Sequence, residues 1–156
     1  MIELEIPGFG DVRLSHVVLD LNGTIACDGE LVSGVAQAVA NLRDSVEVVA
    51  VTADTHGTAA ALRDRLSIPF HLIERGAEEQ AKLAFVESLG CERVAVIGNG
   101  ANDAASLAAA RVGVAVIGCE GACVAALSSA DVVCTSIVDA LALFERPARL
   151  LATLRS

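Results

Sequence analysis

The chain has 156 residues, a net charge of −9 at pH 7, and 54% hydrophobic but only 3% aromatic residues. This length predicts one domain over residues 1–156, and the acidic balance argues against nucleic acid and anionic membranes as partners, since phosphate backbones bind Lys and Arg. No apolar run approaches the roughly 18 residues of a membrane span, and the N-terminus lacks signal-peptide features, so we expect a cytoplasmic protein with no membrane contact.

The first part of the chain predicts two hairpins around a buried strand. Residues 2–14 alternate apolar and polar side chains around a Pro-Gly turn, which is typical of a hairpin added at the edge of a sheet. Val17, Val18 and Leu19, continued by Leu21, form an apolar run of the kind found at the centre of a parallel sheet. Asp28-Gly29 is a turn signal within 25–32 and predicts a short, flap-like hairpin after that strand.

Helical and strand patterns then alternate to the end of the sequence. Ser33 is expected to cap the first helix, with Val35, Val39 and Leu42 on one face. Gly90 is expected to end the third helix, whose inward residues would be Leu83, Val86 and Leu89. This alternation predicts an α/β fold with a single doubly wound, Rossmann-like parallel sheet. We predict helices at about 33–44, 55–66, 76–89, after 103, at 124–127 and at 138–154 (kinked or restarted near Pro147), and strands at 46–51, 69–73, 94–97, 112–117 and 132–134.

The five cysteines form no C-x-x-C pair. Cys119 and Cys123 could face each other on one helical turn, which is a weak metal signal without a nearby His. We interpret most of the five as small, buried apolar residues; they are Cys27, Cys91, Cys119, Cys123 and Cys134.

Polar residues stand where a parallel α/β sheet binds its ligands, outside the carboxyl ends of its strands. Asp20 follows the first central strand, and its carboxylate could be a nucleophile or a metal ligand beside a turn that can hold an anion. Thr52 follows the second strand, Lys82 lies on the third helix, and Asn99 and Asp103 follow the fourth strand. Each also has a plainer interpretation, as a strand end, a solvated helical charge, a turn or a helix start.

Taken in this order, these residues resemble the haloacid dehalogenase superfamily of phosphohydrolases and phosphotransferases. The resemblance covers about residues 16–133. Within the superfamily, residues 98–107 (G-N-G-A-N-D-A-A-S-L) look most like the phosphorylation domain of P-type cation ATPases, and Thr52-Ala53-Asp54 and residues 130–133 agree. Because the membrane segments and nucleotide-binding domain of those pumps are absent from the sequence, we expect a free-standing relative that does not pump ions.

The resemblance implies a role for each residue. Asp20 would attack phosphorus and form an aspartyl phosphate, Thr52 would hydrogen-bond a phosphoryl oxygen, and Lys82 would neutralise charge between them. The amides that follow Asp20 would face the transferred group. The residues implied in binding it are Asn22, Gly23, Thr24, Thr52, Ala53, Lys82 and Asn102. The residues implied in holding Mg²⁺ are Asp20, Asn22 through its backbone carbonyl, Asn99 and Asp103.

Two positions depart from the family pattern. Asn22 stands where phosphatases of this family usually have a second Asp, which protonates the leaving group and then activates water. General acid–base catalysis is worth about 10²–10⁴ in rate, so we expect slow turnover, least impaired for acyl and aryl phosphates. Asn99 stands where a metal-binding Asp is usual, and its neutral amide should lower the affinity for Mg²⁺.

Three functions remain open. The first is a Mg²⁺-dependent phosphatase or phosphotransferase acting on a phosphorylated small molecule or protein. The second is a catalytically reduced regulatory or protein-interaction module, which the two Asn departures favour. The third is an unrelated α/β domain such as a response-regulator receiver, ranked last because the second strand ends in Thr52 rather than a phosphate-accepting Asp.

The spacing also predicts that no cap domain covers the site. Only the flap fits between Thr24 and Ser33, and only a helix–strand unit fits between Thr52 and Lys82. Because family members without a cap tend to take macromolecular substrates or use a neighbouring subunit as a lid, we expect a homo-oligomer or a partner protein. Of the histidines, His56 lies nearest the active edge, and we interpret it as a surface residue at a helix start.

Overall fold

The computed structural model describes residues 1–54 and 57–156. The predicted helix start at Thr55 and the side chain of His56 lie outside the described residues. Six strands form the main sheet, and each pairs with its neighbours in parallel. They are β3 (His16–Asp20), β6 (Glu47–Thr52), β7 (Phe70–Leu72), β8 (Val94–Gly98), β9 (Val112–Val116) and β10 (Val132–Cys134). Their order, β10-β9-β8-β3-β6-β7, confirms the predicted doubly wound sheet and places β3 inside it.

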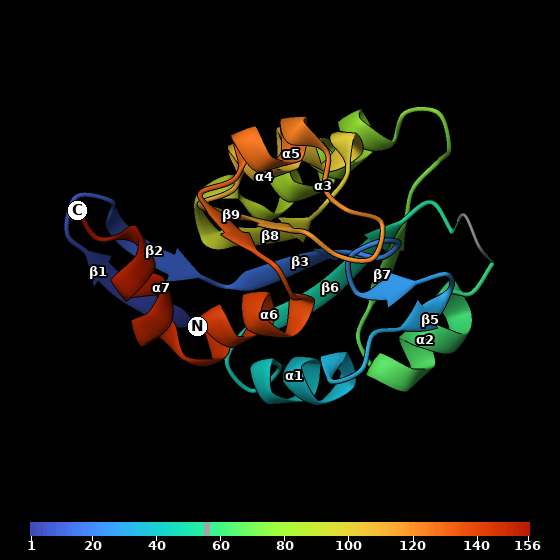
Figure 1. Cartoon of the computed structure of the whole chain (residues 1–156), viewed down its shortest axis with the longest axis horizontal. Helices are drawn as coiled ribbons and strands as arrows, with labels where there is room; N and C mark the ends of the chain where they lie inside the picture. Colours follow the sequence, from blue (N-terminus) through green and yellow to red (C-terminus); the bar gives the residue numbers. More distant parts are fainter. Residues whose placement is uncertain (55–56) are drawn as a thin grey trace.

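Helices cover both faces of this sheet (Figure 1). One face carries α3 (Glu78–Leu89), α4 (Ala104–Ala109) and α5 (Val124–Ser129), while the other carries α1 (Val35–Leu42), α2 (Ala59–Leu66) and α6 (Ile137–Glu145). Two short 3₁₀ helices, η1 (Cys91–Arg93) and η2 (Ala101–Asp103), flank β8.

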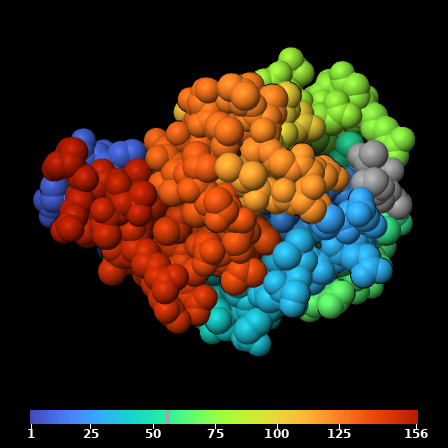
Figure 2. All heavy atoms as spheres, in the orientation of Figure 1, coloured from blue at the N-terminus to red at the C-terminus, as the bar shows by residue number. Residues whose placement is uncertain are grey.

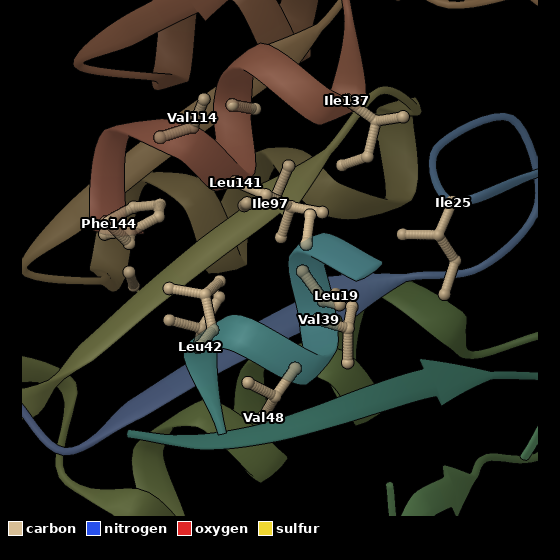
Figure 3. Packing of buried hydrophobic residues seen from close by; sticks show 14 of the residues in the cluster. Leu19, Ile25, Val39, Leu42, Val48, Ile97, Val114, Ile137, Leu141 and Phe144 are labelled. Carbon is tan, nitrogen blue, oxygen red and sulfur yellow. The ribbon is translucent and has the colours of Figure 1, made fainter. Parts of the chain in front are cut away.

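Alternate residues of the central strands divide between the two faces. In β3, Val17 and Leu19 belong to the larger core cluster and Val18 to the smaller one, because successive side chains of a strand point to opposite faces. Figure 3 shows Leu19 meeting Val39 of α1, with Leu141 of α6 near Ile97 of β8. This two-sided burial accounts for the near-continuous apolar runs of the strands and fixes where their polar ends emerge.

The N-terminal hairpin does not join the main sheet. It consists of β1 (Ile2–Ile6) and β2 (Gly10–Leu14), which form a separate antiparallel sheet, so its predicted place at the edge of the main sheet is wrong. The chain runs from β2 directly into the interior strand β3, and the amide of Ser15 bonds to the carbonyl of Arg93 at 2.9 Å. The hairpin therefore extends beyond the amino ends of the strands, where α7 (Pro147–Leu154) packs against β1 (Figure 1).

The flap is present as predicted. It consists of β4 (Ala26–Cys27) and β5 (Glu30–Leu31), joined by Asp28 and Gly29 at φ 52° and 83°. Positive φ at both central residues is the requirement of a type I′ hairpin turn, which Asp-Gly meets. Between Asp20 and α1 the chain adds this flap, and between β6 and α3 its described residues add α2 and β7. In the described chain, therefore, no separate cap domain is inserted at either place.

A disulfide bond joins Cys27 of the flap to Cys119, which follows β9. Figure 2 shows the light-blue flap against the orange segment that carries Cys119. The interpretation of these two cysteines as buried apolar residues is therefore wrong, as it is for the exposed Cys123. The suggested Cys119–Cys123 metal pair is wrong as well, because Cys119 is already bonded. Disulfides are rare in cytosolic proteins, so this bond does not support the expected cytoplasmic location.

The helix boundaries correct two details and confirm a third. Helix α1 begins after Gly34, which has φ 90°, and no side chain caps it, so Ser33 is not the predicted cap. Gly90 ends α3 at φ 84°, as predicted, but the buried residues of that helix are Lys82 and Val86. Leu83 and Leu89 are only half-buried. The last helical segment restarts at Pro147, which separates α6 from α7.

Among the described residues, no helix combines the length and apolar character that a membrane crossing requires.

Candidate active site

The carboxyl ends of β3, β6, β8 and β9 open onto one cavity of about 380 Å³. The strands are parallel, so the residues that follow them meet at one edge of the sheet, and Asp20, Thr52 and Asn99 line the cavity together. Lys82 reaches it from α3. A larger hollow of about 520 Å³ lies near Ser15, at the amino end of β3, away from these residues.

Asp20 and Lys82 form a buried ion pair at the bottom of this cavity. Lys82 Nζ donates to Asp20 Oδ1 at 2.6 Å, and the two side chains are 7% and 11% exposed, respectively. Lys82 is the one lysine in the sequence; every other basic residue apart from the histidines is an arginine. Its place on α3 is explained by the helix period, since Val86 one turn later packs into the core beside it.

Burial dominates the protonation of Asp20. Desolvation and the neighbouring Asp103 carboxylate raise the pKa of Asp20 to about 7, although Lys82 and a hydrogen bond from Thr24 oppose the shift. Burial works to lower the pKa of Lys82, but the carboxylates of Asp20 and Asp103 and the bonds to them raise it above its ordinary value. Lys82 is therefore a fixed positive charge, while Asp20 titrates near neutrality.

Asp103 is a buried carboxylate that holds Lys82 and the loop after β8 in place. Its Oδ1 accepts from Lys82 at 2.6 Å, and its Oδ2 accepts from the backbone amides of Asn99 and Gly100 at 3.0 and 2.9 Å. Asp103 is 1% exposed and does not line the cavity. The expectation that Asp103 ligates a metal stays a prediction; in this structure its two oxygens bond to Lys82 and to the amides of the loop after β8. Asn102 does line the cavity, and its side-chain oxygen accepts from Lys82 at 3.3 Å.

Thr24 joins the loop after β3 to the loop after β8. Its hydroxyl donates to Asp20 Oδ2 at 3.0 Å and to Asn99 Oδ1 at 3.2 Å, so these two oxygens converge on one point. The backbone amide of Thr24 donates to the carbonyl of Leu21, and that of Gly23 donates to Ala26. The expectation that these two amides face a transferred phosphoryl group stays a prediction; in this structure both amides bond to carbonyls of their own loop.

Thr52 is placed to donate a hydrogen bond into the cavity. It is 3% exposed, and its hydroxyl oxygen accepts from the amide of Asp54 at 3.1 Å. A hydroxyl that accepts in this way still has its own hydrogen to donate. Ala53 lines the cavity beside it.

Asn22 also lines the cavity, and its amide oxygen is buried without a hydrogen-bond partner among the described residues. A buried, unpaired polar atom is costly, and in a binding cavity it indicates a place for a ligand atom. Asn22 therefore presents an acceptor where an acid would present a proton.

The oxygens of this cavity fit a hard divalent cation. Asp20 Oδ2 and Asn99 Oδ1 converge at Thr24, and Asn22 adds neutral oxygens. In the described part of the chain no three His, Cys, Asp or Glu side chains gather as a metal cluster. The donor set is therefore one carboxylate with neutral oxygens, which suits a cation that keeps several of its waters. When Asp20 and Asp103 are both ionised, the cluster that they form with Lys82 has a net charge of −1. This charge repels an incoming phosphate, so the site needs a cation to offset the repulsion.

Two carboxylates in this cavity were missed from the sequence. Glu78 lies at the start of α3, where the backbone amides of Gly76 and of Glu78 itself lower its pKa. Glu120 lies in the turn after β9, and its carboxylate stands against Gly23 and Asn99. The signal that could have found Glu120 is its place after a predicted strand, within Gly-Cys-Glu-Gly.

Comparison with known sequences gives the family of this chain. The sequence model of the haloacid dehalogenase-like hydrolases matches residues 2–111. A Mycobacterium tuberculosis protein named "Probable cation-transporting ATPase G" is 39% identical over 113 residues, which are 72% of this chain but 14% of that protein. The chain thus spans a small part of the curated ATPases that it matches.

Solved structures share the fold. A zinc-transporting PIB-type ATPase in its E2.Pi state superposes with a TM-score of 0.64 at 27% identity, over 78% of this chain and 20% of that one. A 3-deoxy-D-manno-octulosonate 8-phosphate phosphatase from Moraxella catarrhalis, in complex with magnesium, phosphate and KDO, has a TM-score of 0.67 at 16% identity. That likeness covers 91% of this chain and 94% of the phosphatase.

Proposed function

The chain belongs to the haloacid dehalogenase-like hydrolases, and we propose that this phosphohydrolase works through an aspartyl phosphate on Asp20. The observation that carries the proposal is the buried Asp20–Lys82 pair at the bottom of a cavity open to solvent. A carboxylate held by an ammonium and a hydroxyl is oriented for attack, because both partners fix its oxygens.

The reaction would proceed in two displacements. Asp20 attacks phosphorus, the bond from phosphorus to the leaving oxygen breaks, and that oxygen departs with the bonding electron pair. Water then attacks the aspartyl phosphate, the bond from phosphorus to Asp20 breaks, and the carboxylate is restored while the proton of water passes to the released phosphate. Lys82 stabilises the charge that builds on the transferred group, and the Thr52 hydroxyl donates to one of its oxygens.

Mg²⁺ would be held by Asp20, the backbone carbonyl of Asn22 and the side-chain oxygen of Asn99. When bound, the cation would offset the negative charge of the phosphate against that of the cluster. Asp103 would act indirectly, by holding Lys82 in place. The affinity for Mg²⁺ should be modest, since one carboxylate is the only charged donor in this set.

The leaving group should limit the rate. Asn22 has no proton to give, and general acid catalysis is worth about 10²–10⁴ in rate. Acyl and aryl phosphates leave without such help, so they should be turned over fastest. The physiological substrate would be a phosphorylated small molecule or protein, with a homo-oligomer or partner protein covering the open site.

Acid-trapping of the phosphoenzyme tests this proposal. The protein is mixed with Mg²⁺ and ³²P-labelled acetyl phosphate, precipitated in acid, and treated with hydroxylamine, which cleaves acyl phosphates. We expect hydroxylamine-sensitive label on the wild type and none on Asp20→Asn. The matched control is Asp44→Asn, which removes an exposed carboxylate far from the cavity and should label normally. Equal labelling of wild type and Asp20→Asn would refute the proposal.

A second candidate function is a regulatory or interaction module that binds phosphorylated partners without rapid turnover. The amide of Asn22, in place of an acid, favours it. Phosphate binding by titration calorimetry, together with no label in the trapping experiment, would support this function instead.

A further inference from the structure

Glu120 faces the cavity from the turn after β9. A Cβ built on Gly23 would stand 2.5 Å from Glu120 Oε2 and 2.7 Å from Asn99 Nδ2, so the carboxylate lies over the loop that follows Asp20. In the described part of the chain, no hydrogen bond or ion pair engages this carboxylate. Glu78, the other carboxylate at the mouth of the cavity, is held by backbone amides at the start of α3.

The turn that carries Glu120 is fixed to the site. The amide of Gly121 donates to the carbonyl of Gly118 at 3.0 Å, and Asn99 Nδ2 donates to the carbonyl of Gly121 at 3.1 Å. Gly118 lies so close to the Gly23 carbonyl that a Cβ there would stand 2.8 Å from it. Cys119, the neighbour of Glu120, is bonded to the flap. The backbone that carries Glu120 is therefore held in place beside the cavity.

The walls of the cavity around Asp20 offer hydrogen-bond acceptors. Asn22 presents an unpaired amide oxygen there, and Glu78 and Glu120 present carboxylates. Among the described residues that line the cavity, Lys82 is the one cation, and its bonds to Asp20, Asn102 and Asp103 occupy it. A leaving group that enters this region therefore meets acceptors and negative charge.

We infer that Glu120 is a specificity-determining residue, which makes the cavity prefer phosphorylated substrates whose leaving group carries an amine or other hydrogen-bond donors. The inference rests on the proposed function for the orientation of the substrate, with phosphorus at Asp20 and the leaving group outward. A carboxylated leaving group would be repelled by the same residue. A unit charge about 6 Å away in water-like surroundings changes affinity roughly three-fold, so the two kinds of substrate should differ roughly ten-fold.

The test compares two aryl phosphates with the same reactive group. Tyramine O-phosphate carries an ammonium, and the phosphate of 3-(4-hydroxyphenyl)propanoate carries a carboxylate, while both release a phenol of similar acidity. We expect the wild type to prefer the ammonium compound roughly ten-fold in kcat/KM. Glu120→Gln keeps the shape of the side chain and should lower this ratio several-fold, leaving only the preference that Glu78 contributes.

Glu92→Gln is the matched control. It removes the same charge from η1, at the amino end of β8, and should leave the ratio unchanged, because charges so far apart are screened. A ratio that Glu120→Gln and Glu92→Gln change equally would overturn the inference.

Binding to a protein that cannot turn over separates this inference from the proposed function. In Asp20→Asn, and in Asp20→Asn combined with Glu120→Gln, the dissociation constants of both compounds are measured by calorimetry. A charge preference that Glu120→Gln lowers several-fold, in a protein whose wild type releases no phosphate, would keep the inference and refute the function. Turnover with a ratio that Glu120→Gln does not change would keep the function and refute the inference.

Discussion

The ammonium of Lys82 lies 2.6 Å from Oδ1 of Asp103, a carboxylate that does not line the cavity. Lys82 thus holds Asp20, the carboxylate that lines the cavity, on one side and is itself held by Asp103 on the other. The two acids therefore have different roles. Asp20 faces the cavity, and Asp103 sets the position of the Lys82 ammonium that pairs with Asp20.

Lys82→Met should destabilise the protein in a pH-dependent way. Removing the cation leaves Asp20 and Asp103 buried together, and breaking a buried pair from one side costs about 3–5 kcal/mol. The loss of unfolding free energy should be largest near about pH 8 and smaller near about pH 5, where Asp20, whose pKa burial raises, can bind a proton. Urea denaturation at both values measures it, and Arg65→Met, at an exposed site on α2, is the control. Equal losses at the two pH values would contradict the prediction.

Asp20→Asn should raise stability at alkaline pH while it abolishes phosphoenzyme formation. The folded pKa of Asp20 is raised from 3.8 to about 7. Between these values the folded state holds a proton that the unfolded state has released, so this group's contribution to stability falls as pH rises and then stays low. Relative to the wild type, the free energy of unfolding of the variant should be higher by on the order of 1 kcal/mol near about pH 8, which corresponds to about 2–4 °C in Tm. Near about pH 4 the two proteins should be almost equally stable. Calorimetric melting measures this difference, and a gain that is constant with pH would count against it.

Gly98→Ala should damage the site more than Gly100→Ala. A Cβ at Gly98 would stand 2.5 Å from Asp103 Cγ and 2.8 Å from its Cβ, so the buried carboxylate must move and Lys82 loses its support. At Gly100 the nearest atom is Asn102 Oδ1, at 2.8 Å, on an exposed side chain that can rotate away. We expect at least about a ten-fold loss of phosphoenzyme formation for Gly98→Ala, as for other displaced catalytic groups, and a small effect for Gly100→Ala. Initial labelling rates compare them, and the reverse order would show that Asp103 does not position Lys82.

Cys119→Ser should lower the free energy of unfolding by about 2–4 kcal/mol, because the disulfide with Cys27 closes a loop of 92 residues and restricts the unfolded chain. Cys123→Ser, at an exposed cysteine outside the bond, is the control and should change little. Thiol titration of the denatured wild type gives an independent reading. With one disulfide among the five cysteines, three thiols should react before reduction with dithiothreitol and all five after it.

The sequence alone predicted the sheet and most of the cavity for one physical reason. Strands buried on both faces must be apolar throughout, so polar residues mark their ends, and parallel strands bring those ends to one edge. Asp20, Thr52 and Asn99 could therefore be placed together from their positions after three predicted strands, and the family resemblance added Lys82. The Asp-Gly turn of the flap and the helix restart at Pro147 could be predicted from the sequence, because each depends only on the backbone conformation that its own residues favour.

The tertiary structure decided what depends on contacts between segments far apart in the chain. Asp103 follows a strand like the other site residues, yet it turns inward to Lys82, because the amides of Asn99 and Gly100 and the ammonium all converge on its carboxylate. The hydroxyl of Thr24 bridges two loops while its amide closes its own. Cys27 meets Cys119, and Glu120 reaches the cavity, because the turn after β9 packs on the loop after β3. Residue order places a side chain at an edge of the sheet, but only the packing of the loops determines which way it points and what it meets.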